Sequence, residues 1–188
     1  IDGNVYETIQ IGDQLWMAEN LKVTHYNDGD EIQYVQQESS EPDVWKNLST
    51  GAYGYYDDDP AHQVTYGNLY NWYAVDDDRG VCPAGWHVPS DDEYTVLTDY
   101  LGGSEVAGGK MKEIGLDHWN SPNDGATNES GFTGLPAGDR VSSNGSYYNM
   151  GILGYFWSSS EYSSSNAWYR LLAYDYSKVY RYNYTKQG

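Results

Sequence analysis

The segment at residues 80–101 constrains the fold more than any other part of the chain, because it contains a clear helix start. Pro89 keeps the backbone extended, and Ser90 follows it with Glu93 three residues later. A serine and a glutamate at this spacing form a capping box, in which each side chain satisfies a backbone N–H group at the start of a helix. The sequence therefore predicts a helix from Ser90 to Leu101.

The predicted helix has one apolar face, which needs a sheet to pack against. Tyr94, Leu97 and Leu101 lie at positions i, i+3 and i+7 and share that face, and two glycines follow the helix. The segments on both sides are rich in short alternating patterns and turn residues, which are typical of strands. A chain of 188 residues suits one domain. We therefore predict a single α+β domain over residues 1–188, with short helices packed on antiparallel strands and many loops.

Alternation and turn residues predict where the strands lie. Residues 6–11 and 14–17 form a predicted hairpin, and residues 69–75 a predicted short helix. The C-terminal part contains five predicted strands, at residues 132–135, 147–150, 154–158, 167–174 and 178–184. We expect both chain ends to build the antiparallel sheet on which the helix packs, and we expect Trp86 and Trp157 to be substantially buried.

Two other regions carry weaker signals. Residues 27–60 are polar and contain several turn-forming pairs, but they also contain aromatic side chains that favour packing on the domain. We predict a long loop there, with a helical turn at residues 44–48. A further helical turn is predicted at residues 110–114.

Several motifs occur together in one order along the chain. They are Tyr66-Gly-Asn-Leu-Tyr-Asn-Trp-Tyr-Ala74, Cys82-Pro-Ala-Gly-Trp-His-Val-Pro-Ser90, Asn128-Glu-Ser-Gly-Phe132 with Leu135-Pro-Ala-Gly138, and Phe156-Trp-Ser-Ser-Ser-Glu-Tyr162. With these motifs the chain resembles the Fibrobacter succinogenes major paralogous domain. The resemblance implies a C-type-lectin-like α+β fold, also found in formylglycine-generating enzymes, on secreted or cell-surface proteins of Bacteroidetes and their relatives. It implies no established biochemical activity.

Cys82 is the only cysteine, so the chain as given cannot form an internal disulfide. Members of the resembled family usually continue past the position of Gly188 with a strand that contains an Arg-Cys pair, so the resemblance implies that the last C-terminal strand is missing here. Cys82 is then either a buried, inert thiol or half of a disulfide whose partner lies beyond Gly188. Both alternatives stay open.

The acidic composition argues against whole classes of partner. Lys and Arg number 10 against 28 Asp and Glu, and the net charge of -18 repels nucleic acid and anionic membranes. No apolar run approaches the roughly 20 residues of a membrane-spanning helix. Tyr and Trp number 21 and 7 against two Phe, which favours half-buried aromatic side chains on an extracellular surface. We expect an extracellular or cell-surface location.

The sequence contains no recognisable catalytic motif. The four histidines are scattered, no nucleophile elbow or metalloprotease motif occurs, and one cysteine with four separate histidines does not make a zinc site. The paired cysteines of formylglycine-generating enzymes are also lacking, so that activity does not follow from the resemblance. We predict that the protein is not an enzyme and requires no cofactor. The less favoured alternative is a carbohydrate-active or other enzyme, because the 28 acidic residues could supply a carboxylate pair that the sequence does not locate.

Two loops rich in side-chain oxygens are candidate calcium sites. The candidate ligands are Asp76, Asp77, Asp78, Asn123, Asp124, Asn128 and Glu129. Calcium favours several carboxylate and carbonyl oxygens from a loop. The alternative is that these residues form solvated acidic loops and local turns in which side chains replace backbone hydrogen-bond partners.

The C-terminal strands carry the strongest candidate for a binding surface. The candidate residues are Tyr169, Arg170, Tyr174, Tyr176, Tyr180, Arg181, Tyr182 and Tyr184. Along the last predicted strand the tyrosines alternate and so share one face, and we expect an exposed tyrosine patch edged by Arg170, Lys178 and Arg181. Such a surface suits a recognition or adhesion module for a protein or glycan ligand outside the cell. Two alternatives are a subunit that assembles with copies of itself into a filament or surface layer, and a tyrosine ladder that only stabilises the sheet.

Overall fold

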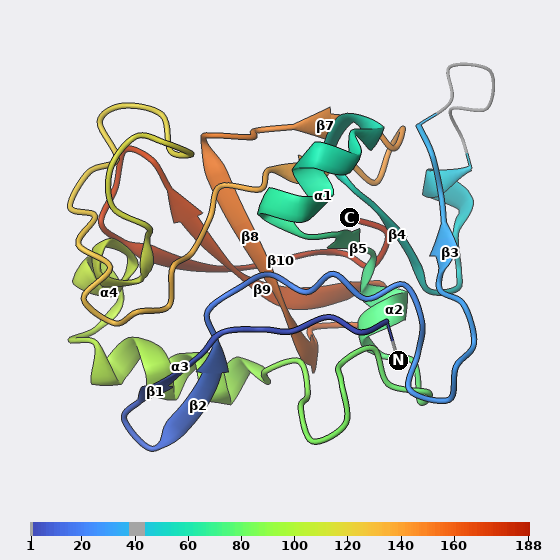
Figure 1. Ribbon diagram of the computed structural model, residues 1–188, viewed down its shortest axis with the longest axis horizontal. Helices are drawn as coiled ribbons and strands as arrows, with labels where there is room; N and C mark the ends of the chain where they lie inside the picture. The colour runs from blue at the N-terminus through green and yellow to red at the C-terminus, as the bar shows by residue number, and fades with distance from the viewer. Residues whose placement is uncertain (1, 38–43) are drawn as a thin grey trace.

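The computed structural model describes residues 2–37 and 44–188, which combine short helices with small sheets (Figure 1). The α-helices are α1 (Pro60–Tyr66), α2 (Trp72–Val75), α3 (Asp91–Tyr100) and α4 (Ser104–Met111), and 3-10 helices cover Trp45–Asn47 and Tyr56–Asp58. The strands are β1 (Thr8–Ile11), β2 (Gln14–Met17), β3 (Gln33–Tyr34), β4 (Ala52–Gly54), β5 (Leu69–Tyr70), β6 (Asp139–Arg140), β7 (Tyr147–Tyr148), β8 (Leu153–Glu161), β9 (Asn166–Ala173) and β10 (Val179–Thr185). The predicted α+β class is confirmed.

The strands of the described residues pair into four separate small sheets. Strands β1 and β2 form the predicted hairpin, and β8, β9 and β10 form an antiparallel sheet with the order β10-β9-β8. In a third sheet β4 pairs with β3 in parallel and with β5 in antiparallel orientation, while β6 and β7 form the fourth. The expectation of one sheet built by both chain ends is wrong, because the N-terminal strands pair only with each other.

Helix α3 begins with the capping box predicted from the sequence. The Ser90 hydroxyl accepts a hydrogen bond from the Glu93 backbone N–H at 3.2 Å, and the Glu93 carboxylate accepts one from the Ser90 N–H at 2.7 Å. Tyr94, Leu97 and Leu101 are all buried, as expected of the apolar face. The local sequence signal and the tertiary packing therefore agree along this helix.

The main core lies between α3, the N-terminal hairpin and the sheet β8–β10. Trp16 of the hairpin packs on Tyr94 of α3 with 5.3 Å between ring centroids, and Leu172 and Val179 contribute from the sheet. Figure 1 shows the hairpin beside α3. The hairpin thus covers the helix without joining the main sheet.

An ion cluster ties the start of α3 to two strands, with Asp91 and Arg170 buried and Arg181 exposed. The carboxylate of Asp91 accepts hydrogen bonds from Arg170 Nη1 at 2.6 Å and from Arg181 Nη2 at 2.7 Å. Arg170, on β9, is buried, and its Nη2 also donates to the Asp91 carbonyl at 2.9 Å and to Thr95 Oγ1 at 3.1 Å. The helix terminus is therefore held on the sheet by charged hydrogen bonds as well as by apolar packing.

Lys112, directly after α4, is a second buried cation. Its ammonium group donates to the backbone carbonyls of Asp124, Ala173 and Tyr176 at 2.9, 2.8 and 3.0 Å. Burial lowers the pKa of Lys112 to about 8. One side chain thereby joins the end of α4, a long loop and the β9–β10 turn.

The region before residue 76 contains two elements that the sequence analysis did not predict. Helix α1 begins at Pro60, where the Asp59 carboxylate accepts from the Ala61 N–H at 2.8 Å, and it follows directly on the predicted loop at residues 27–60. The predicted helix at 69–75 is divided into β5 and α2, with Asn71 as the helix cap. Pairing of β5 with β4 explains the division, since a local helix pattern cannot show a strand partner elsewhere in the chain.

Two predictions after α3 are wrong. The helical turn expected at residues 110–114 is instead the end of α4, which starts at Ser104. Its glycines, Gly108 and Gly109, are poor helix formers, but they let Lys178 and Gly125 approach closely, because an added Cβ would collide with those carbonyls. Residues 132–135 form no strand, because Thr133 has a positive φ of 56°.

The region 27–60 is more structured than predicted where the structure describes it. The expected turn at residues 44–48 corresponds to the 3-10 helix Trp45–Asn47, and Trp45 is buried. Strands β3 and β4, which were expected to be loop, pair in this region. Residues 38–43 lie outside the described residues.

No helix in the described residues is long and apolar enough to cross a bilayer. Helix α3, with 10 residues, has the largest span, about half of the ~20 residues that a crossing needs. The prediction that the chain contains no membrane-spanning helix is confirmed for the described residues.

Replacement of Asp91 by Asn should reduce the free energy of unfolding by about 3 to 5 kcal/mol, the usual loss when one partner of a buried ion pair is removed. Burial alone would raise the pKa of Asp91. Hydrogen bonds from Arg181 and Arg170 lower this pKa by more than burial raises it, so the pKa lies below its usual value. The carboxylate therefore stabilises the fold at pH values above the unfolded pKa, and this contribution disappears as the pH falls through the folded pKa.

Urea denaturation at several pH values would measure this effect. Exposed Asp92 provides the matched control, and its replacement by Asn should cost less than about 1 kcal/mol. An equal loss of stability in the two variants would contradict the role of the ion cluster.

Cys82 is a buried, free thiol, and burial raises its pKa to about 11. Only about one thiol in a thousand is then ionised at pH 8, so a thiol-specific reagent should react slowly with the native protein and rapidly after unfolding in urea. The reaction can be followed by absorbance with and without urea. Similar rates in both conditions would show that the thiol is accessible in the folded state.

Candidate functional site

The sheet β8–β10 has two chemically different faces. One face packs on α3 and carries Arg170, Leu172 and Val179. Strand alternation and pairing place a set of aromatic residues on the other face. We call this set the aromatic face, and it consists of Tyr155, Trp157, Tyr169, Tyr180, Tyr182 and Tyr184.

The rings of the aromatic face form a connected row across three strands. Tyr169 lies at its centre, with ring centroids 5.6 Å from Tyr155, 5.9 Å from Trp157 and 6.2 Å from Tyr182. Tyr182 stacks on Tyr180 at 5.7 Å with an angle of 10° between the planes. Distances of this size are typical of favourable aromatic pairs.

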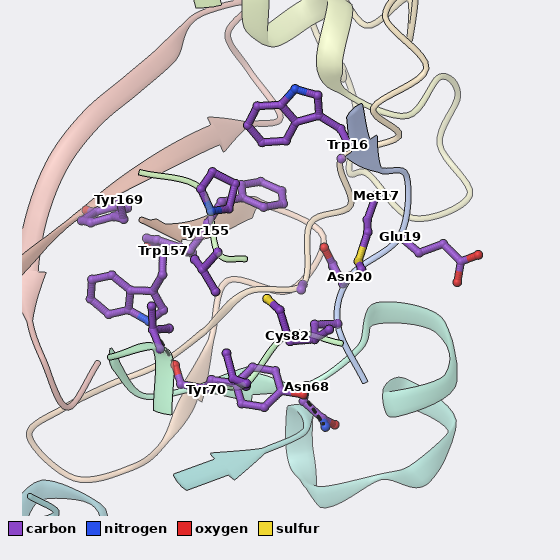
Figure 2. A pocket seen from close by; sticks show the side chains of 18 of the residues that line it. Trp16, Met17, Glu19, Asn20, Asn68, Tyr70, Cys82, Tyr155, Trp157 and Tyr169 are labelled. Carbon is purple, nitrogen blue, oxygen red and sulfur yellow. Dashed lines mark hydrogen bonds between the residues drawn. The ribbon is translucent and has the colours of Figure 1, made fainter. Parts of the chain in front are cut away.

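One end of the aromatic face forms a wall of a large pocket. The pocket has a volume of about 790 Å³, and Tyr155, Trp157, Tyr169 and Tyr184 line it. Figure 2 shows the first three of these side chains across the cavity from Trp16 and Met17. The remaining walls come from segments that are distant in sequence, including residues 19–21, 66–70, 81–89 and 132–140.

The pocket is lined mainly by aromatic and aliphatic side chains. Its further aromatic residues are Trp16, Trp45, Tyr66, Tyr70, Trp86, Tyr94, Phe132 and Phe156. Cys82 also lies in the wall. A concave, mostly apolar surface of this size is typical of a ligand site.

Polar groups are few in the pocket and mostly engaged with the protein itself. Asn68 Nδ2 donates to the Val23 carbonyl at 3.0 Å and to the Tyr70 hydroxyl at 3.1 Å. Asp139 accepts a hydrogen bond from Asn149 Nδ2 at 2.7 Å, and burial raises the pKa of Asp139 above its usual value. These contacts fix the walls, while the aromatic groups supply most of the surface for a ligand.

His87 and Glu93 form the clearest acid–base pair at the pocket, with His87 Nε2 at 2.9 Å from Glu93 Oε1. The same carboxylate group caps α3 through Ser90. Its contacts therefore account for a structural role. The arrangement supports binding more directly than bond-breaking chemistry.

The structure brings only part of the predicted binding set together. Tyr169, Tyr180, Tyr182 and Tyr184 share the aromatic face, and Tyr176 lies beside it with its ring 6.2 Å from Tyr180. Tyr174 instead packs against the main core. The candidate set is therefore narrower than the sequence predicted.

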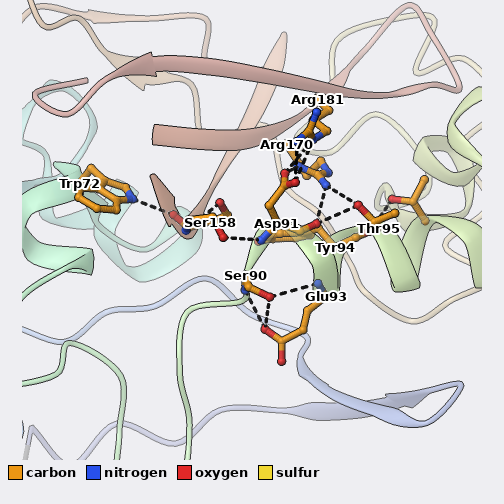
Figure 3. A network of polar contacts seen from close by, with 11 residues as sticks. Trp72, Ser90, Asp91, Glu93, Tyr94, Thr95, Ser158, Arg170 and Arg181 are labelled. Atoms are coloured by element: carbon orange, nitrogen blue, oxygen red, sulfur yellow. Dashed lines mark hydrogen bonds and ion pairs between the residues drawn. The ribbon is translucent and has the colours of Figure 1, made fainter. Parts of the chain in front are cut away.

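The two arginines of the predicted set lie on the opposite side of the sheet. Figure 3 shows Arg170 and Arg181 directed toward Asp91. Arg181 also stacks over the Trp168 ring, 3.5 Å from its centroid. The expectation that these cations edge the tyrosine patch is wrong, whereas Lys178 lies 5.6 Å from the Tyr180 ring.

The first predicted calcium loop shows an ion pair with a protein cation. Asp77 accepts hydrogen bonds from Arg79 at 2.8 Å, and Asp76 and Asp78 are exposed. In residues 2–37 and 44–188, no three His, Cys, Asp or Glu side chains are grouped as a metal site would require. Calcium binding by this loop stays a prediction.

The second predicted calcium loop uses its side chains in local hydrogen bonds. Asn123 Nδ2 donates to the carbonyls of Glu113 and Gly115 at 2.9 and 2.8 Å. Asn128 pairs with Thr133 through both its amide oxygen and its amide nitrogen. The other two candidates also contact the protein: Glu129 lies 3.4 Å from Lys110, and the Asp124 carbonyl accepts from Lys112. These contacts favour the turn-forming alternative, and calcium binding here also stays a prediction.

Sequence reasoning missed the pocket. Trp86 and Trp157 are largely buried, as expected, but neither is fully enclosed, and both line this cavity. Trp157 Nε1 donates to the Tyr70 carbonyl at 3.0 Å, which fixes its ring at the wall. The aromatic residues of the quoted motifs were the available signal, but their convergence depends on contacts between distant segments.

Comparison with known proteins identifies the family but no individual relative. No curated protein and no solved structure gives a significant match. The family model described as the Fibrobacter succinogenes major domain matches residues 9–187. This match covers nearly the whole chain, including the hairpin, α3 and the strands of the aromatic face. The chain therefore belongs to the Fibrobacter succinogenes major domain family.

Proposed function

We propose that this domain is a non-catalytic extracellular recognition or adhesion module, and that its aromatic face contacts a protein or glycan ligand. The proposal rests on one observation, the connected row of rings that extends from the pocket to the surface. Tyr182 and Tyr184 retain 49% and 38% of their exposure, and Tyr176 at the end of the row retains 54%. A ladder that served only the sheet would not need such exposed rings.

Tyrosine suits this role for physical reasons. It offers a large, rigid contact area with few rotatable bonds, and its hydroxyl group can hydrogen-bond with a ligand. The stacked pair Tyr180 and Tyr182 is already ordered, which reduces the entropy lost on binding. The proposed binding set therefore retains Tyr169, Tyr176 and the three tyrosines of β10.

We also propose that the domain has the C-type-lectin-like arrangement expected from the family resemblance. Support comes from the capped helix α3, which packs on the antiparallel sheet β8–β10, and from the many loops between the short elements. An extracellular location agrees with the acidic, tyrosine-rich composition. Neither proposal requires calcium or another cofactor.

Self-assembly into a filament or surface layer is the second candidate, because an exposed aromatic row also suits contact with a neighbouring subunit. The ion cluster weakens the electrostatic route to assembly. Arg170 and Arg181 contact Asp91 of their own chain, and Lys178, the one expected edge cation near the tyrosines, pairs with Glu105 at 2.7 Å. With a net charge of -18, copies should repel one another at low salt. A foreign ligand is therefore the preferred partner.

Replacement of both Tyr180 and Tyr182 by Ser should abolish ligand capture with little loss of stability, because Tyr182 is exposed and both rings lie on the face away from α3. Binding of the purified chain to arrays of immobilised glycans and extracellular proteins would test this. Tyr100→Ser is the matched control, since Tyr100 is 66% exposed on α3, outside the aromatic face.

Sedimentation velocity of the same samples at low and high salt would measure self-association. Loss of array binding in the double variant alone would support the recognition function. Loss of an oligomer in that variant, without array binding by the wild type, would favour self-assembly. Unchanged behaviour of a folded double variant in both assays would overturn both proposals.

A further inference from the structure

Among the described residues, strand β2 has one edge without a partner strand, and this edge borders the pocket. The backbone N–H of Ala18 donates to the Glu7 carbonyl at 2.9 Å, so this position points toward β1. Backbone groups alternate along an antiparallel strand, and the N–H and C=O groups of Leu15 and Met17 therefore point away from β1. Both residues line the pocket, whereas β1 contributes none of the lining residues.

The outward groups of Leu15 and Met17 are available for pairing. Within the described parts of the chain, no backbone hydrogen bond joins them to another segment. Leu15 is 55% exposed, so its side chain leaves this edge uncovered. An unpaired strand edge is a template for an added strand.

The opposite wall of the pocket has a similar edge. The N–H of Leu153 in β8 donates to the Asn149 carbonyl at 3.0 Å, and its carbonyl accepts from the Gly138 N–H at 2.9 Å, so both groups point away from β9. By the same alternation, the backbone groups of Trp157 also point away from β9. In the described residues no backbone hydrogen bond reaches them from another segment. The β8 edge is thus occupied at Leu153 by residues 138 and 149, and only its Trp157 position adds to the free edge of β2 beside the cavity.

We infer that the pocket binds an extended peptide segment of a partner protein, which adds as a strand to the free edge of β2 and places apolar side chains among the aromatic residues. This inference goes beyond the recognition function proposed above, because the peptide site at the pocket does not include Tyr180 or Tyr182. Strand addition gives affinity through backbone hydrogen bonds, and pockets for alternate side chains give specificity. A cavity of about 790 Å³ beside the edge supplies such a pocket.

Charge favours a peptide with basic residues at its ends. Asp13, Glu19, Glu93 and Asp139 line the pocket, on a molecule with a net charge of -18. The lining cation Arg140 is buried, and its guanidinium donates to the carbonyls of Val35 and Gly145. The acidic groups therefore dominate the field that a peptide encounters.

The test selects peptides of about nine residues, a common strand length, from a random display library with the full chain as bait. Enriched peptides should alternate apolar and polar residues and carry Lys or Arg near their ends. Their affinities can be measured by tryptophan fluorescence, since Trp16, Trp86 and Trp157 line the pocket. On binding, amide hydrogen exchange should slow at Leu15 and Met17.

Leu15→Pro removes one outward N–H that the hairpin does not use, so the hairpin should still form. It should weaken peptide affinity about fivefold to tenfold, the effect of one lost hydrogen bond, whereas the matched variant Leu15→Ala should bind nearly as well as the wild type. Methylation of every second backbone nitrogen of the peptide gives two sets of peptides. The set whose methylated nitrogens face β2 should lose a similar factor in affinity.

The inference is overturned if no peptide is enriched, if Leu15→Pro and Leu15→Ala bind a selected peptide equally, or if exchange at Leu15 and Met17 does not change. The inference is also overturned if an apolar dye or a glycan binds more tightly than any peptide, and if neither an added peptide nor Leu15→Pro changes that binding. The cavity would then be assigned to another ligand. Tyr182 does not line the pocket, so Tyr182→Ser should retain peptide binding. If Tyr182→Ser loses array binding and no peptide binds the protein, the recognition function is supported and only this inference is rejected.

Discussion

The contact between the start of α3 and the sheet β8–β10 is the interaction on which the rest of the structure depends. Asp91 accepts hydrogen bonds from Arg170 and Arg181, on neighbouring strands, and both arginines therefore face the helix. Removing the Arg170 guanidinium and the Asp91 carboxylate from water is costly, and their hydrogen bonds, together with those from the exposed Arg181, offset that cost. The cluster thus fixes which face of the sheet the helix covers, and by alternation it leaves the tyrosines on the other face.

Buried cations perform a similar role elsewhere in the molecule. Lys112 binds three backbone carbonyls, and Arg140 binds the carbonyls of Val35 and Gly145 and stacks 4.0 Å from the centroid of the Trp45 ring. Irregular loops contain many carbonyl groups without strand or helix partners, and a cationic side chain can satisfy several of them at once. Because the chain has only 10 Lys and Arg residues, this use leaves its surface still more acidic.

The pocket and the aromatic face depend on these internal contacts. The walls of the pocket come from distant segments, and their positions are set by hydrogen bonds such as that from Trp157 Nε1 to the Tyr70 carbonyl. Trp86 and Trp157 at the wall are only partly buried because they border the cavity. A recognition surface of this kind requires an ordered scaffold, since ring positions are maintained by neighbours and not by the strand alone.

The sequence alone determined the features that depend on near neighbours: the capping box of Ser90 and Glu93, the N-terminal hairpin, and the alternation that places Tyr180 and Tyr182 on one face. These features arise from spacings of two to four residues, which local sterics and hydrogen bonding control. Only the tertiary structure decided that Arg170 and Arg181 bind Asp91, that residues 69–75 divide into a strand and a helix, and that Trp86 and Trp157 border a cavity. The reason is that each of these outcomes depends on a partner far away in the chain, and periodicity carries no information about such a partner.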